Sequence, residues 1–131
     1  MFTEGVKVTI GGKELDLVLN TEAMAQLADK YGDIDGVADR LNNASYSEQI
    51  RIIPELIALL ASQGEAIKDS GEVITPQFVS RNTLPRDIKT LTDSFLRACA
   101  IGLNITIDTE DGDTDEVLAA IQKNAPGAAG N

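Results

Sequence analysis

The densest group of side chains that could do chemistry is an acidic run near the carboxyl end of the chain. Its members are Asp108, Glu110, Asp111, Asp113, Asp115 and Glu116, with no basic residue among them. Carboxylates suit Ca²⁺, and the helix-loop-helix calcium motif sets a turn glycine between oxygen ligands at the first and last loop positions. With Gly112 at the turn, those ligands would be Ile107 and Leu118, which cannot coordinate. The spacing therefore favours a solvated acidic linker over a metal site.

The remaining candidates for catalysis are few. Without histidine, the chain lacks Ser-His-Asp and Cys-His pairs, histidine metal sites and the usual general base near neutral pH. The single cysteine, Cys99, lies on the apolar side of an expected helix with no basic neighbour to activate it, which predicts a packed core thiol. Gly12-Lys13 resembles the end of a phosphate-binding loop, but Glu14 replaces the required hydroxyl residue and Lys7 the first glycine. We therefore expect no catalytic residue, no cofactor and no metal, hence not an enzyme.

The composition limits the partners and the compartment. The chain has 131 residues, of which 43% are hydrophobic, and a net charge of −10 from 11 basic and 21 acidic residues. Binding to nucleic acid or an anionic membrane depends on Lys and Arg, so this balance disfavours both. A signal segment and an apolar run of about 18 residues are both missing. With one unpaired cysteine, these features predict a cytoplasmic protein without membrane or nucleic-acid partners.

The amino-terminal residues carry the clearest structural pattern, an alternation of apolar and polar side chains on both sides of Gly11-Gly12. Two glycines suit the positive φ angles of a tight hairpin turn. With this turn, Val8 faces Leu15 and Val6 faces Leu17. Lys7 then opposes Asp16 as a favourable charge pair on the other face. The apolar face would consist of Val6, Val8, Ile10, Leu15, Leu17 and Leu19.

A helix follows directly, started by Asn20 or Thr21 and ended by Gly32. Its apolar stripe, at helical spacing, is Met24, Leu27, Ala28 and Tyr31. An isolated hairpin is marginally stable in water. Its apolar face should therefore rest on this helix or on later ones. Because the connection is short, we expect it to pack on the stripe of this helix.

Four more helices are expected within the globular part. Asp33 or Asp35 can cap one whose buried stripe is Ile34, Val37, Ala38 and Leu41. A second covers 48–62, where Pro54 either bends the helix or opens another. Thr75-Pro76 starts a short helix, and Pro85 opens a long amphipathic one. We therefore predict a mostly helical α+β fold with an N-terminal β-hairpin packed on a bundle of about five helices. Residues 1–107 would form one globular domain, and 108–131 an acidic linker, a short helix and a disordered C-terminus.

The helix expected over 48–62 is apolar on nearly all sides. Such a helix is normally buried, either in the core or in an interface. A core helix is the simpler interpretation, since a domain of this size needs one. The alternative is a surface for a partner or for self-association, for which the candidate residues are Ile52, Leu56 and Leu59.

The layout of the chain resembles the tail assembly chaperones of long-tailed phages and prophages. The matching segments are the opening VTIGGKELDLVLNTEAMAQLADKYGDIDGVADRL, the apolar middle helix, LTDSFLRACAIGL, and DTDEVLAAIQKN after the acidic linker. The resemblance implies a mostly helical α+β fold without enzymatic activity, working in the host bacterial cytoplasm. It implies a role in keeping the tape measure protein soluble while tail tube proteins polymerise around it. Members of this family often form homo-oligomers.

Two other functions are compatible with the sequence. A structural tail component, such as a connector or tube subunit, would more often be richer in strands. An acidic inhibitor that mimics DNA would need carboxylates arrayed over a fixed surface, whereas here most of them lie in one run.

Overall fold

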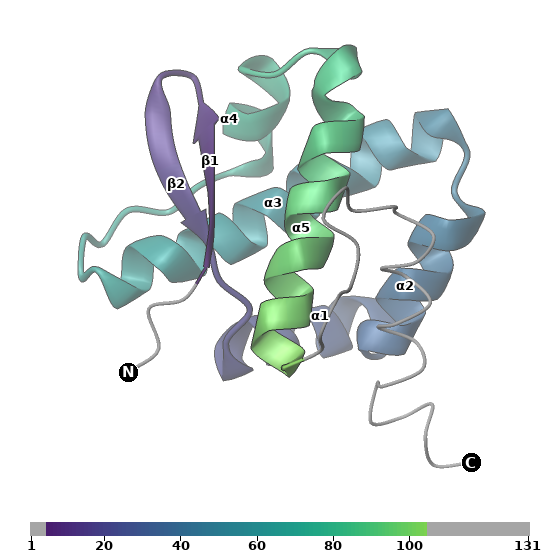
Figure 1. Ribbon diagram of the computed structural model, residues 1–131, viewed down its shortest axis with the longest axis horizontal. Helices are drawn as coiled ribbons and strands as arrows, with labels where there is room; N and C mark the ends of the chain where they lie inside the picture. The colour runs from purple at the N-terminus through teal and green to yellow at the C-terminus, as the bar shows by residue number, and fades with distance from the viewer. Residues whose placement is uncertain (1–4, 105–131) are drawn as a thin grey trace.

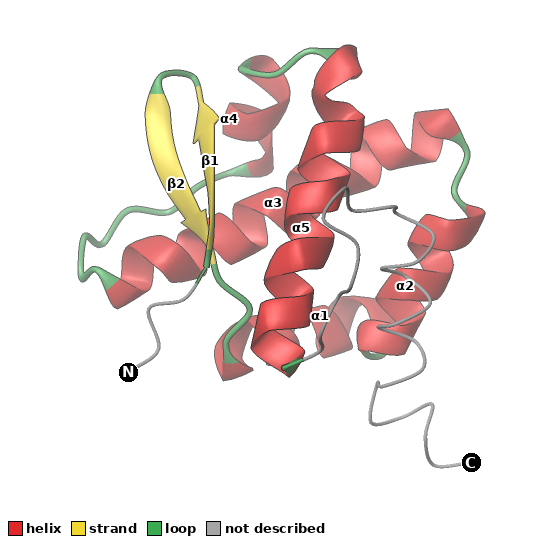
Figure 2. Ribbon diagram, in the orientation of Figure 1, coloured by secondary structure: helices red, strands yellow, loops and turns green. Residues whose placement is uncertain are grey.

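The computed structural model describes residues 5–104, which form a β-hairpin and a set of packed helices (Figures 1 and 2). The elements, in chain order, are β1 (Val6–Ile10), β2 (Lys13–Leu17), α1 (Thr21–Tyr31), α2 (Ile34–Asn43), α3 (Tyr46–Ile67), α4 (Pro76–Arg81), the 3₁₀ helix η1 (Pro85–Asp87) and α5 (Ile88–Leu103). This architecture confirms the predicted α+β fold. The expected acidic linker, short terminal helix and C-terminal tail, at 108–131, lie outside the described residues.

The hairpin has the predicted register. Val6 pairs with Leu17 and Val8 with Leu15 in an antiparallel ladder. On the outer face, the Lys7 Nζ lies 3.0 Å from Asp16 Oδ1. Gly11 and Gly12 form the turn with φ angles of 59° and 78°, a region that glycine enters without steric cost. The alternation of the sequence was therefore sufficient to define this unit.

The hairpin packs on α3 and α5 rather than on α1, so the predicted contact with the stripe of Met24, Leu27 and Tyr31 was wrong. The backbone N–H of Val18 donates to the Leu60 carbonyl of α3 at 3.2 Å, which fixes the end of β2 to that helix. Figure 1 shows the hairpin beside α5, with α3 passing behind both. The physical reason is that α3 and α5 are longer and offer a wider apolar surface than α1, whose stripe packs on α2 and α3 instead.

Side-chain caps begin α1 and α2 where the sequence predicted, whereas α3 begins at Tyr46 and ends at Ile67, beyond both bounds of the expected 48–62. The Asn20 Oδ1 accepts from the Ala23 N–H at 2.9 Å, and the Asp33 Oδ1 accepts from the Gly36 N–H at 2.8 Å. Ser45 and Glu48 form a reciprocal capping box at the start of α3. All four predicted stripe residues of α2 are buried. The caps and stripes together account for where these helices begin and which face they bury.

Helix α3 is the centre of the fold. It is one continuous helix of 22 residues that includes Pro54, so the proline does not open a separate helix. The hairpin, α1, α4 and α5 pack around it from different sides. This arrangement explains why most of the apolar residues of α3 are buried, because different elements cover different parts of its surface.

Candidate functional site

The described residues offer no site for metal or thiol chemistry. Within 5–104, no group of three His, Cys, Asp or Glu side chains is arranged to hold a metal ion. Cys99 is completely buried, and this burial raises the pKa of its thiol well above the usual value, so the group stays protonated. The prediction of a packed core thiol is confirmed. In the same part of the chain, every helix is too short or too polar to span a lipid bilayer.

The three residues proposed as a partner surface occupy different environments. Leu56 is fully buried and Ile52 is 7% exposed, so both belong to the hydrophobic core. Their assignment to a binding surface is therefore corrected: the elements packed around α3 cover them. Leu59 is only partly buried and lies at the floor of an open groove. Of the trio, Leu59 alone is placed to contact another molecule.

The groove runs along α3, between α1 and the segment that leads into α4. Its volume is about 540 Å³, within the range of roughly 300–1,000 Å³ that is common for ligand sites. Helix α1 supplies Gln26 and Lys30. The other lining residues are Glu55, Ala58, Leu59, Ser62, Gln63, Ala66, Gly71, Glu72, Val73, Ile74 and Pro76. Leu59, Ala66 and Val73 make part of this lining apolar, and Val73 is 74% exposed.

Hydrogen bonds to Ser62 hold one wall of the groove in place. The Ser62 Oγ donates to the Ile74 carbonyl at 3.1 Å and accepts from the Ile74 N–H at 2.9 Å. These two bonds fix Ile74 against α3, within the stretch 71–75 that has no helix or strand of its own. At the side facing α1, the Asn20 Nδ2 donates to Gln63 Oε1 at 3.1 Å. The groove is thus held by specific contacts on both sides.

The charged side chains that line the groove are paired with one another or with near neighbours. The Lys30 Nζ lies 2.7 Å from Glu55 Oε1, and the Lys13 Nζ lies 2.7 Å from Glu72 Oε1. Tyr31 also donates to Glu55 at 3.3 Å, and burial together with the Glu55 charge raises the pKa of Tyr31 to about 12. Because these charges are already matched, the groove has little net charge of its own. It suits a ligand that is mainly apolar.

Sequence reasoning missed one wall of the groove. The predictions from sequence name neither Val73 nor Ile74. The available signal was an apolar pair directly before the Thr75-Pro76 helix start. An apolar pair in a connecting segment is stabilised when it packs on other apolar side chains. Ile74 is buried in the core, whereas Val73 is exposed at the rim of the groove.

Comparisons of the chain with protein-family models, with curated proteins and with solved structures found no match. Support for a function therefore comes from the groove and from the resemblance to tail assembly chaperones.

Proposed function

We propose that this protein is a tail assembly chaperone that binds an apolar helical segment of a tape measure protein in the groove along α3. The observation that carries the proposal is the groove itself, with Leu59 at its floor and Val73 at its rim. The resemblance to phage and prophage tail assembly chaperones supports the tape measure protein as client. The protein would act by binding, without an enzymatic step.

The groove has features that suit a helix. Leu59, Ser62 and Ala66 lie three and four residues apart along α3, so they share one face of that helix. The small, exposed side chain of Ala66 allows a second helix to approach α3 closely. Helix-in-groove recognition places anchors of the bound helix at the same three- and four-residue spacing. One or two large apolar anchors beside Leu59 would bury the exposed side chain of Val73.

The charge of the protein suits a role in solubility. A client segment rich in apolar residues aggregates when it is not covered, and covering it removes that surface from water. The bound protein adds a net charge of −10 to the complex, which opposes association between complexes. The tail tube protein, which polymerises around the tape measure protein, is a second proposed partner.

Coexpression with the tape measure protein tests the proposal. We expect the unchanged protein to keep its client in the soluble fraction. Val73→Glu should weaken binding on the order of tenfold, a loss of about 1.4 kcal/mol, and so lower that soluble fraction. Val73 is exposed, so the substitution leaves the fold intact. Leu59→Glu is a second groove variant with the same expected result.

The matched control is Ile101→Glu, which introduces the same charge at an exposed apolar residue of α5 that does not line the groove. Melting temperatures of all three variants show whether each is folded. Full rescue by folded Val73→Glu and Leu59→Glu would contradict the proposed site. If Ile101→Glu lowers the soluble fraction of the tape measure protein as much as the groove variants do, the added charge alone explains the loss, and the groove is not the binding site.

A further inference from the structure

One uncharged side chain of the groove carries a hydrogen-bond donor that the fold leaves unused. Gln63 lines the groove from α3 and is half-buried. Its Oε1 accepts from the Asn20 Nδ2 at 3.1 Å, and within residues 5–104 its Nε2 donates no hydrogen bond. An amide nitrogen offers N–H donors only. The groove, although suited to an apolar ligand, therefore contains a polar group that seeks an acceptor.

The orientation of the Gln63 amide is set by Asn20. Asn20 is the N-cap of α1, and its Oδ1 accepts from the Ala23 N–H at 2.9 Å. The Nδ2 of Asn20 is then the group that faces Gln63, and because a nitrogen donor requires an acceptor, the Gln63 Oε1 turns toward it. Asn20 itself does not line the groove, so the Nε2 is left on the groove side. The cap that starts α1 thereby makes Gln63 present a donor rather than an acceptor.

The other uncharged polar side chains of the groove already have partners. The Ser62 hydroxyl both donates to and accepts from the backbone of Ile74. The Gln26 Nε2, on α1, donates to Glu22 Oε2 at 2.9 Å. Among the described residues that line the groove, Gln63 is the uncharged side chain whose donor nitrogen is without a partner. Its nitrogen is therefore the polar feature that a bound segment has to match.

A helix that covers the groove removes water from the Gln63 nitrogen. A buried donor without an acceptor costs free energy, whereas the same donor paired with an oxygen contributes a net gain. The oxygen has to come from a side chain, because carbonyl groups inside a helix are bonded within it. Ser and Thr hydroxyls can bond a carbonyl of their own helix instead. Side-chain amides, as in Asn and Gln, are therefore the better acceptors.

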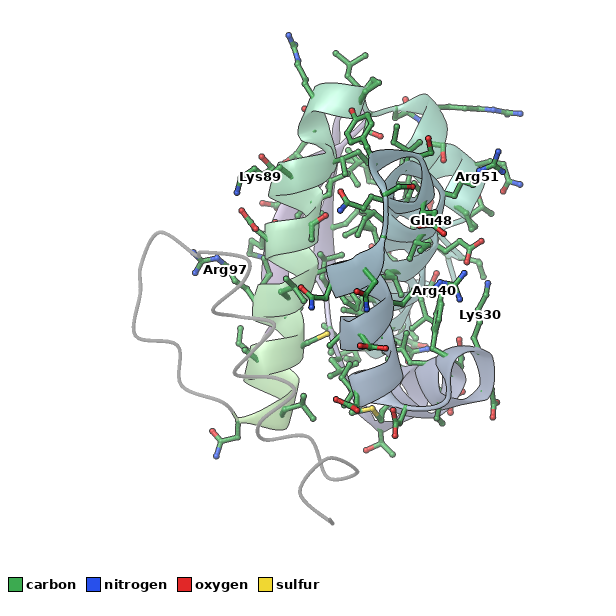
Figure 3. All side chains as sticks on the ribbon, turned by 90° about the vertical axis from the view of Figure 1, so that its right-hand side faces the viewer. Lys30, Arg40, Glu48, Arg51, Lys89 and Arg97 are labelled. Carbon is green, nitrogen blue, oxygen red and sulfur yellow. The ribbon has the colours of Figure 1, made fainter. Side chains whose placement is uncertain are left out.

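A carboxylate is a poorer match than an amide. The nearest cation that lines the groove is already used, since the Nζ of Lys30, which extends from α1 (Figure 3), lies 2.7 Å from Glu55 Oε1. The protein has a net charge of −10, which repels a further negative charge. A charged group also loses more solvation than an amide when it enters an apolar groove. These effects together favour an uncharged oxygen.

We propose, on the basis of the proposed function, that Gln63 determines which apolar helices the groove accepts. Its Nε2 donates to the side-chain oxygen of an Asn or Gln on the bound segment. The preferred client is thus an apolar helix with one side-chain amide on the face that lies against α3. A fully apolar helix leaves the Gln63 nitrogen unpaired and binds more weakly than its apolar area alone would give.

A double-mutant cycle with synthetic peptides tests this role of Gln63. The probes are alanine-leucine helices of about 20 residues, with either Gln or Met, which are similar in length, at one central position. The rest of each peptide is uniform, so it can slide until that position lies at Gln63. Both peptides are titrated calorimetrically into the full-length parent and into Gln63→Met. We expect a coupling of roughly fivefold in Kd between Gln63 and the peptide Gln, as one net hydrogen bond of about 1 kcal/mol gives.

Asn20→Asp reverses the Gln63 amide without changing Gln63. Aspartate is an equally good N-cap but has no donor, so the Gln63 Nε2 should turn toward the new carboxylate and its oxygen toward the groove. The probe is the same peptide with methionine sulfoxide at the central position, whose oxygen accepts hydrogen bonds and cannot donate them. We expect it to bind the parent roughly fivefold more tightly than Asn20→Asp, whereas the Met peptide should bind both equally.

These titrations distinguish a failure of the Gln63 contact from a failure of the groove. Melting temperatures show that each variant is folded. If the Met peptide binds and Val73→Glu weakens it, but the cycle shows no coupling or the sulfoxide peptide binds parent and Asn20→Asp equally, the role of Gln63 is overturned and the groove remains the binding site. Failure of every peptide to bind the parent would contradict the proposed function and the role of Gln63 together.

Discussion

Leu17→Asp is expected to unfold the protein or to remove most of its stability. The Leu17 side chain has no exposed surface and lies between the hairpin and the helices packed on it. The substitution loses about 1.5–3 kcal/mol of apolar burial and adds a carboxyl group with no buried partner, at a further cost of several kcal/mol. Domains of this kind have total stabilities of about 5–15 kcal/mol. Denaturant titration followed by circular dichroism measures the loss.

Asp16→Asn is the matched control, one residue away on the opposite face of β2. Partial burial alone would raise the pKa of Asp16, but its bonds with Lys68 and Lys7 outweigh that effect and lower the pKa. Both lysines lie 3.0 Å from the carboxylate and are largely exposed. Exposed ion pairs contribute about 0–1 kcal/mol each, so this variant should remain folded. Equal stability of Leu17→Asp and the parent would contradict the described packing of the hairpin.

Gly64→Ala is expected to destabilise the protein by about 1–3 kcal/mol, although alanine is normally the better helix former. Gly64 lies on α3 where β2 crosses it, and a Cβ there would overlap the carbonyl oxygen of Asp16. The strand and the helix must move apart to accept it. Ser47→Ala, at an exposed position in the first turn of α3, should change stability by no more than about 0.5 kcal/mol. A gain in stability from Gly64→Ala would show that strand and helix are not in close contact.

Local pattern was enough to predict the units of this fold. The period-two alternation and the Gly11-Gly12 turn define the hairpin register, because a shift by one residue would mix its faces. Helix starts were equally predictable, since Asn20, Asp33 and Thr75 are side chains that satisfy free amides. These signals act over a few residues and do not depend on the rest of the chain.

How the units pack could not be predicted in the same way. The apolar face of the hairpin is compatible with any apolar helix, and the choice of α3 and α5 over α1 depends on contacts between residues far apart in sequence. The same limit applies to the candidate site. A helix that is apolar on nearly all sides can lie in the core or in an interface with a partner. Which of its side chains are exposed depends on how many other elements of the fold cover it. Ile52 and Leu56 are covered, whereas Leu59 remains at a groove.

Chemical-shift mapping tests most directly whether the groove along α3 binds an apolar helical segment. A synthetic apolar helical segment of the tape measure protein is added to the ¹⁵N-labelled full chain. We expect amide signals of residues 26–30, 55–66 and 71–76 to shift in the parent and these shifts to be lost in Val73→Glu. Shifts confined to other surfaces, or unchanged in Val73→Glu, would contradict it.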